Sequence, residues 1–296
     1  MKKTTGFLQL MRPANIVTSI ADVLAGIAIS GFLTNSNFLA NNISPVILLC
    51  ISTIGLYGGG VVFNDVFDAG LDKAERPERP IPRGIVSIRE AAFLGIVLLL
   101  TGVVAAAIVS RISGLLALSI SIAALIYNKW SKHHAIAGPL NMGLCRGLNL
   151  LLGISIVTSA VPEWWFIAII PMIYIAAITM ISKGEVHGGS KSTLYFAGFL
   201  YCMVIAAILF LSFTKEMLWW TIIFLLPFAW MIFSALIKAI RVPAPQNIGK
   251  AVKAGVVALI LMNAAWAAAF EAIGLAFVIV LLLPLSLWLS KIFAVT

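Results

Sequence analysis

The sequence predicts an all-α fold, a polytopic transmembrane helical bundle of nine or ten helices. Hydrophobic residues make up 61% of the 296 residues and charged residues only 10%, and the mean hydropathy is +1.08. Apolar stretches of about 17 to 25 residues, the helix length that crosses roughly 30 Å of hydrocarbon, recur along the whole chain. No polar linker is long enough to separate two domains, so residues 1–296 are expected to form a single integral-membrane domain.

Ten apolar runs carry this prediction. The first run follows a basic start and lacks a small-residue cleavage site, so it is expected to stay in the protein as a signal anchor. Short connections such as SRISG and VPEWW separate runs on the outer side, whereas Glu271 alone divides the last two, which leaves nine or ten spans open. The runs cover residues 14–33, 45–64, 90–110, 112–128, 137–158, 164–182, 193–213, 217–238, 250–270 and 272–292.

The distribution of the net charge of +9 along the chain indicates how the chain is oriented in the membrane. If the N-terminus is cytoplasmic, 17 of the 20 lysines and arginines fall on inner segments, while only Arg111 and Lys215 lie on outer loops and Arg146 lies within a span. This bias is what the positive-inside rule expects of an integral protein of a bacterial-type cell membrane. We therefore expect no nucleic-acid partner, and an anionic lipid or an anionic substrate remains a second interpretation of the charge.

Polar residues gather at one end of the even-numbered spans. With the N-terminus inside, every even span ends on the cytoplasmic face, where the longest polar loops also lie. Side chains from distant parts of the sequence are thus brought to one depth and are expected to line a single cavity that faces the cytoplasm. They are Asn64 and Asp65, Tyr127, Lys183 and Glu185, and Lys238.

The stretch NDVFDAGLD ends the second span with four oxygen-bearing side chains. If the helix continues through residue 72, Asn64, Asp65, Asp68 and Asp72 are spaced by three or four residues and share one face. Carboxylates this close repel one another near lipid, so they require a cation, and Mg²⁺ fits because it prefers oxygen ligands. The alternative is a solvated helix end whose acids pair with basic residues of the following KAERPERPIPRG.

These motifs resemble those of the UbiA superfamily of intramembrane prenyltransferases. Asn64 to Asp72 reads as the family's NDxxDxxxD motif, and the Arg-Pro pattern of RPERPIPRG is also similar. Leu10-Met-Arg-Pro13 with Asn15 resembles the start of the family's first helix, and Tyr127-Asn-Lys-Trp-Ser-Lys132 resembles its tyrosine-to-lysine element. The resemblance covers nearly the whole chain in length, helix spacing and motif order, and the first acidic motif is its most specific part.

The second acidic motif departs from the family. Members carry a DxxxD-type element at the end of the sixth helix, followed by Gly-x-x-Ser-Thr, which resembles residues 189–193 here. That alignment places Glu185 on the second acid and leaves Ile181 or Ser182 where the first acid is expected. The segment KGEVHGG, together with GPLNMGLCRGLNLLLG, is similar to the EboC-like subgroup.

The resemblance implies a prenyltransferase that requires Mg²⁺ and works within the membrane. It would transfer an isoprenyl group from a prenyl diphosphate to an aromatic or other lipophilic acceptor. The prenyl tail would lie between apolar helices, in contact with membrane lipid. The implied catalytic residues are Asp68, Asp72, Tyr127 and Lys132. The implied metal ligands are Asn64, Asp68, Asp72 and Glu185. The implied substrate-binding residues are Arg12, Asn15, Asn64, Asp65, Arg146, Lys183 and His187.

Several of these residues have simpler interpretations. Arg12 is also suited to anchoring the first span at the interface, and Lys132 to enforcing topology. His187 is also typical of a loop or helix cap, and Arg146 of a structural ion pair within the bundle. The missing carboxylate near Ser182 leaves a second function open, a UbiA-like protein that has lost turnover and binds or transports a lipophilic or prenylated metabolite.

Overall fold

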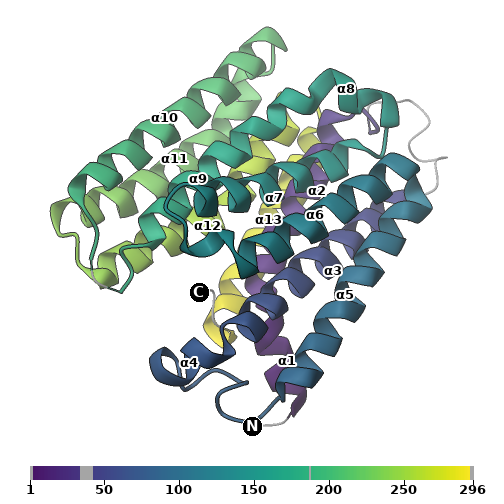
Figure 1. The fold of residues 1–296 in the computed structure, drawn as a ribbon. Coiled ribbons are helices and arrows are strands. Elements are labelled where there is room, and N and C mark those ends of the chain that lie inside the picture. The colour runs from purple at the N-terminus through teal and green to yellow at the C-terminus, as the bar shows by residue number, and fades with distance from the viewer. Residues whose placement is uncertain (1–2, 34–42, 187, 294–296) are drawn as a thin grey trace.

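In this computed structural model the described residues are 3–33, 43–186 and 188–293, and their regular structure is helical (Figure 1). Short 3-10 turns at Ser131–His133, Thr158–Ala160 and Trp165–Ala168 join some of the helices. The helices are α1 (Lys3–Met11), α2 (Pro13–Ile29), α3 (Ser44–Phe67), α4 (Ala69–Glu75), α5 (Ile88–Val109), α6 (Arg111–Lys129), α7 (Ala137–Ile154), α8 (Val161–Trp164), α9 (Ile169–Ser182), α10 (Lys191–Thr214), α11 (Leu218–Arg241), α12 (Pro245–Ala269) and α13 (Ile273–Ile292).

Each of the ten predicted spans coincides with helix. By length and composition, eight helical segments of the described chain are able to cross a membrane, or nine if the bent pair α1 and α2 counts as one span. The remaining segment, α7, has 18 residues, and its polar Asn141, Arg146 and Asn149 lower its hydropathy. Arg146 and Asn149 are buried in the bundle, whereas Leu140 and Leu144 are exposed, so α7 turns its polar face inward and an apolar face outward.

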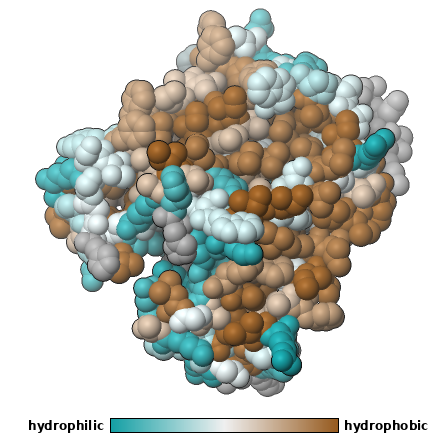
Figure 2. All heavy atoms as spheres, in the orientation of Figure 1, coloured by the Kyte–Doolittle hydropathy of each residue, from teal (hydrophilic) through white to brown (hydrophobic). Residues whose placement is uncertain are grey.

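Helix α12 lies at the centre of the bundle, and every residue from Val257 to Ala269 is buried. One core cluster joins α2, α7 and the helices from α9 to α13, and a second joins α2 and α7 to α3, α5 and α6. Figure 1 shows the two groups on either side of α2, α7 and α12. Apolar side chains cover the face over α3, α5 and α6, and polar ones gather around the indentation between α9 and α4 (Figure 2).

The chain bends by 42° between α1 and α2. Arg12 occupies the left-handed region with φ 49°, and Pro13 follows as the first residue of α2. Proline has no backbone N–H and restricts the residue before it, so the helix of α1 ends here. The break directs the Arg12 side chain toward Asp65 of α3.

The acidic stretch forms two helices instead of the single continuous one that we expected. Helix α3 ends at Phe67, and α4 begins at Ala69. Asp68 lies between them with φ −87° and ψ −1°, which is close enough to helical geometry that hydrogen bonds continue through the junction. The Asp68 N–H donates to the Asn64 carbonyl at 3.0 Å, and the Asp72 N–H donates to the Asp68 carbonyl at 2.8 Å.

Helices α2 and α7 cross at two glycines, Gly26 and Gly153. A Cβ atom at Gly26 would lie 2.2 Å from the Leu150 carbonyl oxygen, and one at Gly153 would lie 2.2 Å from the Val23 carbonyl oxygen. Only hydrogen side chains permit this backbone approach, a packing mode typical of membrane helices. The contact fixes the wall of α2 and α7 on which the cavity described below depends.

We predict that Gly153→Ala destabilises the fold. The added methyl group would force α2 and α7 apart, at a cost of about 1–3 kcal/mol as for other overpacked sites. The matched control is Gly249→Ala in α12, where no atom lies within 4 Å of the added Cβ. Thermal unfolding of the purified variants in detergent checks this, and equal transition temperatures for both variants would contradict the close approach.

Candidate active site

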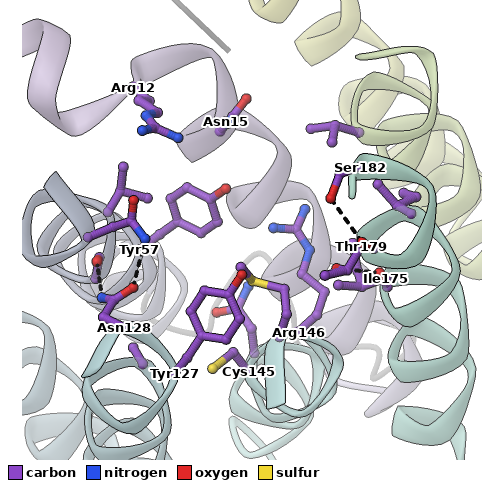
Figure 3. A pocket seen from close by; sticks show the side chains of 18 of the residues that line it. Arg12, Asn15, Tyr57, Tyr127, Asn128, Cys145, Arg146, Ile175, Thr179 and Ser182 are labelled. Atoms are coloured by element: carbon purple, nitrogen blue, oxygen red, sulfur yellow. Dashed lines mark hydrogen bonds between the residues drawn. The ribbon is translucent and has the colours of Figure 1, made fainter. Parts of the chain in front are cut away.

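A cavity of about 380 Å³ lies inside the bundle between α2, α3, α6 and α7 on one side and α9 and α12 on the other (Figure 3). Its charged end, formed by Arg12, Asn64, Arg76 and Glu185, lies at the helix ends. Further in, the lining is mostly aliphatic, and the rings of Tyr57 and Tyr127 project into it. The aliphatic lining includes Leu56, Ile120, Ala124, Met142, Ile175, Ile178, Val252, Val256 and Leu259.

Two buried carboxylates at the charged end are paired with arginines. The Arg12 guanidinium donates to Asp65 Oδ1 at 3.0 Å, and Arg79 Nη1 donates to the same oxygen at 3.1 Å. Arg79 Nη1 also donates to Asp72 Oδ2 at 2.8 Å. The two carboxylates are each 4% exposed, so the arginines supply the charge compensation that burial demands.

The other two polar side chains of the motif make separate contacts. Lys132 forms an ion pair with Asp68 Oδ1. The Asn64 amide donates to Asn128 Oδ1 at 3.1 Å, and Asn128 donates to the Gly60 carbonyl at 2.7 Å. The expected single stripe is therefore divided, because Asp65 and Asp72 turn to Arg79. Asn64 turns instead to Asn128 of α6, and Asp68 to Lys132 in the 3-10 turn after α6.

The donor atoms at this end suit a hard cation, although they are not gathered as a closed metal site. Among the described residues, no three His, Cys, Asp or Glu side chains come together as metal ligands. Mg²⁺ typically takes only one or two carboxylates and completes its octahedron with water and phosphate oxygens. Asn64 and Asp68, one helical turn apart, together with Glu185 at the cavity, are donors of the required type.

The second acidic motif contributes one carboxylate and two hydroxyl groups. Ile181 is packed in the core, whereas Thr179, Ser182 and Glu185 line the cavity. The Ser182 hydroxyl donates to the Thr179 carbonyl at 2.9 Å. Burial raises the pKa of the Glu185 carboxyl above its ordinary value of 4.5, and the charge of Arg76 opposes this shift.

Arg146 occupies the inner part of the cavity. Its Nε lies 2.6 Å from Asp22 Oδ2, and its Nη2 donates to Thr18 Oγ1 at 2.7 Å. The guanidinium lies over the Tyr57 ring at 5.7 Å. A buried arginine needs such a partner, so the ion pair that we gave as the simpler interpretation is present, while the side chain also lines the cavity (Figure 3).

The structure brings together most of the predicted site residues. Arg12, Asn15, Asn64, Tyr127, Arg146 and Glu185 line the cavity. Asp65, Asp68, Asp72 and Lys132 form the ion pairs at its charged end. Lys183 lies elsewhere: it is exposed and donates to the Ala135 carbonyl at 2.9 Å. His187 lies outside the described residues.

Sequence reasoning missed four polar residues of the site. Arg79 bridges two carboxylates, Arg76 and Tyr57 line the cavity, and Asn128 holds Asn64. The alternative of a solvated helix end did offer the basic residues after the motif as partners of its acids, and Arg79 does pair with Asp65 and Asp72, although both acids are buried and not solvated. Tyr57 precedes Asn64 by two helical turns, so the same face of the helix pointed to it.

The fold and the cavity define a polytopic membrane protein whose bundle holds a mostly apolar cavity with acids and bases at one end. Comparison with known proteins identifies its class: the model of the UbiA prenyltransferase family matches residues 23–251. The chain belongs to this family.

Named relatives match parts of the chain. It is 33% identical over 146 residues to the digeranylgeranylglyceryl phosphate synthase of Methanothrix thermoacetophila, covering 49% of this chain and 52% of that protein. It is 27% identical over 195 residues to the protein of the same name from Sulfurisphaera tokodaii, covering 63% of this chain and 67% of that protein. The chain thus spans about half to two thirds of the length of these curated relatives.

Solved structures share the fold. A UbiA homolog from Aeropyrum pernix K1 superposes with a TM-score of 0.69 at 16% identity, over 84% of this chain and 96% of that one. A UbiA homolog from Archaeoglobus fulgidus bound to GPP and Mg²⁺ gives 0.66 at 18% identity, over 91% and 99%. At such identities the likeness establishes the fold.

We predict that Arg79→Met destabilises the protein by about 3–5 kcal/mol, because it leaves Asp72 buried without its cation and Asp65 with Arg12 alone. The matched control is Arg83→Met, since Arg83 is exposed on the same loop. Chemical unfolding in detergent measures the free energies. A loss for Arg79→Met no larger than for the control would contradict the role of this bridge.

We also predict a pH-dependent effect of Glu185→Gln in the absence of divalent cations. Because the pKa of Glu185 is raised in the folded state, its ionisation opposes folding, and stability falls as the pH rises above 4.5. The variant should therefore be more stable than the parent at neutral pH, and the two should converge below pH 4.5. Thermal unfolding across this range measures the difference, and a constant offset at every pH would contradict the assignment.

Proposed function

We propose that the protein transfers an isoprenyl group from a prenyl diphosphate to a lipophilic acceptor, in a reaction that depends on Mg²⁺. The observation that carries the proposal is the cavity itself, which joins an end rich in acids and bases to an aliphatic interior within the bundle. A prenyl diphosphate has the same division into an anionic head and an apolar tail. Membership in the UbiA prenyltransferase family supports the same activity.

Charge balance at this end favours a metal-diphosphate complex over a free diphosphate. The cations and the carboxylates are equal in number, so the site has no surplus positive charge for a multiply charged anion. A hard divalent ion brought with the diphosphate supplies that charge and stabilises the charge developing on the leaving group. The cations are Arg12, Arg76, Arg79 and Lys132, and the carboxylates are Asp65, Asp68, Asp72 and Glu185.

Individual residues then take distinct roles. Asn64, Asp68 and Glu185 would hold the metal, whereas Asp72, the fourth predicted ligand, stays paired with Arg79. Lys132 exchanges its ion pair with Asp68 for diphosphate oxygens and thereby frees that carboxylate. Arg12 faces the diphosphate from α2, and the face of the Tyr127 ring steadies positive charge on the allylic carbon.

The remaining predicted residues support this arrangement. Asp65 orients Arg12 and Arg79, and Asn15 contacts substrate from α2. Arg146 binds the acceptor. Lys183 holds the loop before α7 rather than the reacting groups, because it donates to the Ala135 carbonyl. His187 lies outside the described residues and stays a proposed substrate-binding residue. The charged end faces the cytoplasm, as the distribution of lysine and arginine indicates.

The proposed function does not restrict the acceptor to one chemical class. The matched relatives are named digeranylgeranylglyceryl phosphate synthases, and the Archaeoglobus homolog was solved with GPP. Lipid phosphates therefore join aromatic compounds among the acceptors to be tried. The apolar lining from α9 and α12 accommodates any of these tails.

A second candidate function is binding or export of a prenylated metabolite without turnover. Ser182 stands at the cavity where the family motif has an acid, and the described carboxylates form no group of three. A weaker metal site of this kind would still bind a lipophilic ligand. Turnover measurements on the variant below separate the two functions.

We predict that Asp68→Asn lowers prenyl transfer by about 10²–10³, the range found when one group that stabilises developing charge is removed. Radiolabelled dimethylallyl, geranyl and geranylgeranyl diphosphates are incubated with lipid-extract, aromatic and glyceryl phosphate acceptors, with Mg²⁺ or with EDTA. Glu78→Gln, an exposed acid of the same loop, is the control.

Metal-dependent release of diphosphate by the parent and the control, but not by Asp68→Asn, supports the transferase. If the parent releases none across the panel while it binds prenylated lipids, the transferase is rejected and the binding protein remains.

A further inference from the structure

The inner part of the cavity has a second polar feature, separate from the charged end. We call the side chains Thr53, Arg146 and Asn149, which line the cavity from α3 and α7, the polar wall. Tyr57, whose ring lies 5.7 Å from the Arg146 guanidinium, precedes Asn64 by seven residues, or about 10 Å of helix. A diphosphate at the charged end therefore does not reach the polar wall.

Asp22 compensates the charge of Arg146. Asp22 is 1% exposed, and the atoms that face it are donors: Asn263 Nδ2 at 2.7 Å from Oδ1, and Asn149 Nδ2 at 3.0 Å and Arg146 Nε at 2.6 Å from Oδ2. A protonated carboxyl would leave Arg146 uncompensated in the bundle. The geometry thus holds Asp22 ionised, and the pair has no net charge.

The polar wall keeps hydrogen-bonding capacity on its cavity side. Asp22 and Thr18 lie behind Arg146: Asp22 forms an ion pair with Nε, which makes no hydrogen bond, and Thr18 accepts from Nη2. Nη1 has no hydrogen-bond partner among the described residues. Arg146 is 6% exposed and its guanidinium points into the cavity (Figure 3). Thr53 Oγ1 donates to Asn149 Oδ1 at 2.8 Å, which fixes the amide beside it.

The surroundings restrict what Nη1 binds. The lining from α9 and α12 is aliphatic there, from Ile175, Ile178, Val256 and Leu259. The exception is Thr179, whose hydroxyl donates to the Ile175 carbonyl at 2.8 Å. An anionic group placed there would lose its hydration and gain no net positive charge from the neutral pair. An uncharged oxygen costs much less to bury and satisfies the free donor.

We propose that the polar wall binds an uncharged, hydrogen-bond-accepting head group of the acceptor, a hydroxyl or carbonyl, and selects against a carboxylate. The inference rests on the proposed function in calling this ligand the acceptor. Asp22 is then a specificity-determining residue that acts through Arg146: it cancels the charge that would otherwise attract anions. Tyr57 and Tyr127 flank the site, so an aromatic or allylic carbon beside the oxygen packs between their rings.

The test compares two ligands that differ only in the head group, 4-hexylphenol and 4-hexylbenzoate, at pH 7.5, where the first is neutral and the second is charged. Dissociation constants come from thermal-shift titrations of the full protein in nanodiscs. The quantity measured is the phenol-to-benzoate affinity ratio of each variant relative to the parent, in which partitioning of the ligands into lipid cancels. Asp22→Asn leaves Arg146 uncompensated, and we expect it to shift the ratio at least tenfold toward benzoate.

The control is Glu163→Gln, which also replaces a carboxylate by the matching amide, but at an exposed position before α9. It should leave the ratio unaltered. An unchanged ratio in Asp22→Asn would overturn the proposal, because a purely structural ion pair alters stability alone. Should that variant fail to fold, Asp22→Asn with Arg146→Gln removes both charges together and with them the guanidinium donor Nη1. It should weaken 4-hexylphenol binding at least fivefold, and undiminished binding overturns the proposal.

Binding of radiolabelled geranyl diphosphate with Mg²⁺ is measured on the same samples. The proposed function predicts that Asp22→Asn retains this binding, since the charged end is intact. If the parent does not bind geranyl diphosphate, the proposed function is refuted and the proposal for the polar wall is not. If the affinity ratio is unchanged in Asp22→Asn, the proposal for the polar wall is refuted and the proposed function is not.

Discussion

The structure depends on the compensation of carboxylates that the bundle encloses. Asp65 and Asp72 are nearly inaccessible to solvent, and they are tolerable because Arg79 reaches both while Arg12 reaches the first. Each of these arginines is placed by a break in helix, Arg12 at the bend before Pro13 and Arg79 in the proline-rich loop after α4. Both breaks in the helices lie where cations from two segments converge on the buried acids at the end of α3 and in α4.

Acidic and basic side chains compensate one another at two depths of the cavity, and the two sets differ in their exposure to solvent. At the charged end the pair of Lys132 and Asp68 keeps some contact with solvent, with side chains 11% and 18% exposed, as the exchange proposed above requires. Deeper in, Asp22 and Arg146 are sealed by hydrogen bonds from three helices. An ion pair that is open to solvent suits a site where a metal-bound anion binds and dissociates. A sealed pair suits a fixed, neutral donor.

Much of this was predictable from the sequence, and the remainder was not for identifiable reasons. Long apolar runs determine the helices, because hydrocarbon thickness sets their length, and the spacing in NDVFDAGLD placed its acids at one helix end. Periodicity did not reveal that Asp65 and Asp72 would turn to Arg79, since that depends on how a loop of prolines folds back. The Asp22 and Arg146 pair joins residues far apart in the chain, which single-sequence patterns do not connect.

Membership in the UbiA prenyltransferase family and the shape of the cavity lead to one central claim, that the charged end binds a prenyl diphosphate together with a divalent ion. Equilibrium binding of geranyl diphosphate, measured by calorimetry across a Mg²⁺ titration, tests it most directly. The balanced charges predict that the affinity rises at least tenfold between EDTA and saturating Mg²⁺, about 1.4 kcal/mol. Equal affinity in both conditions would contradict the claim.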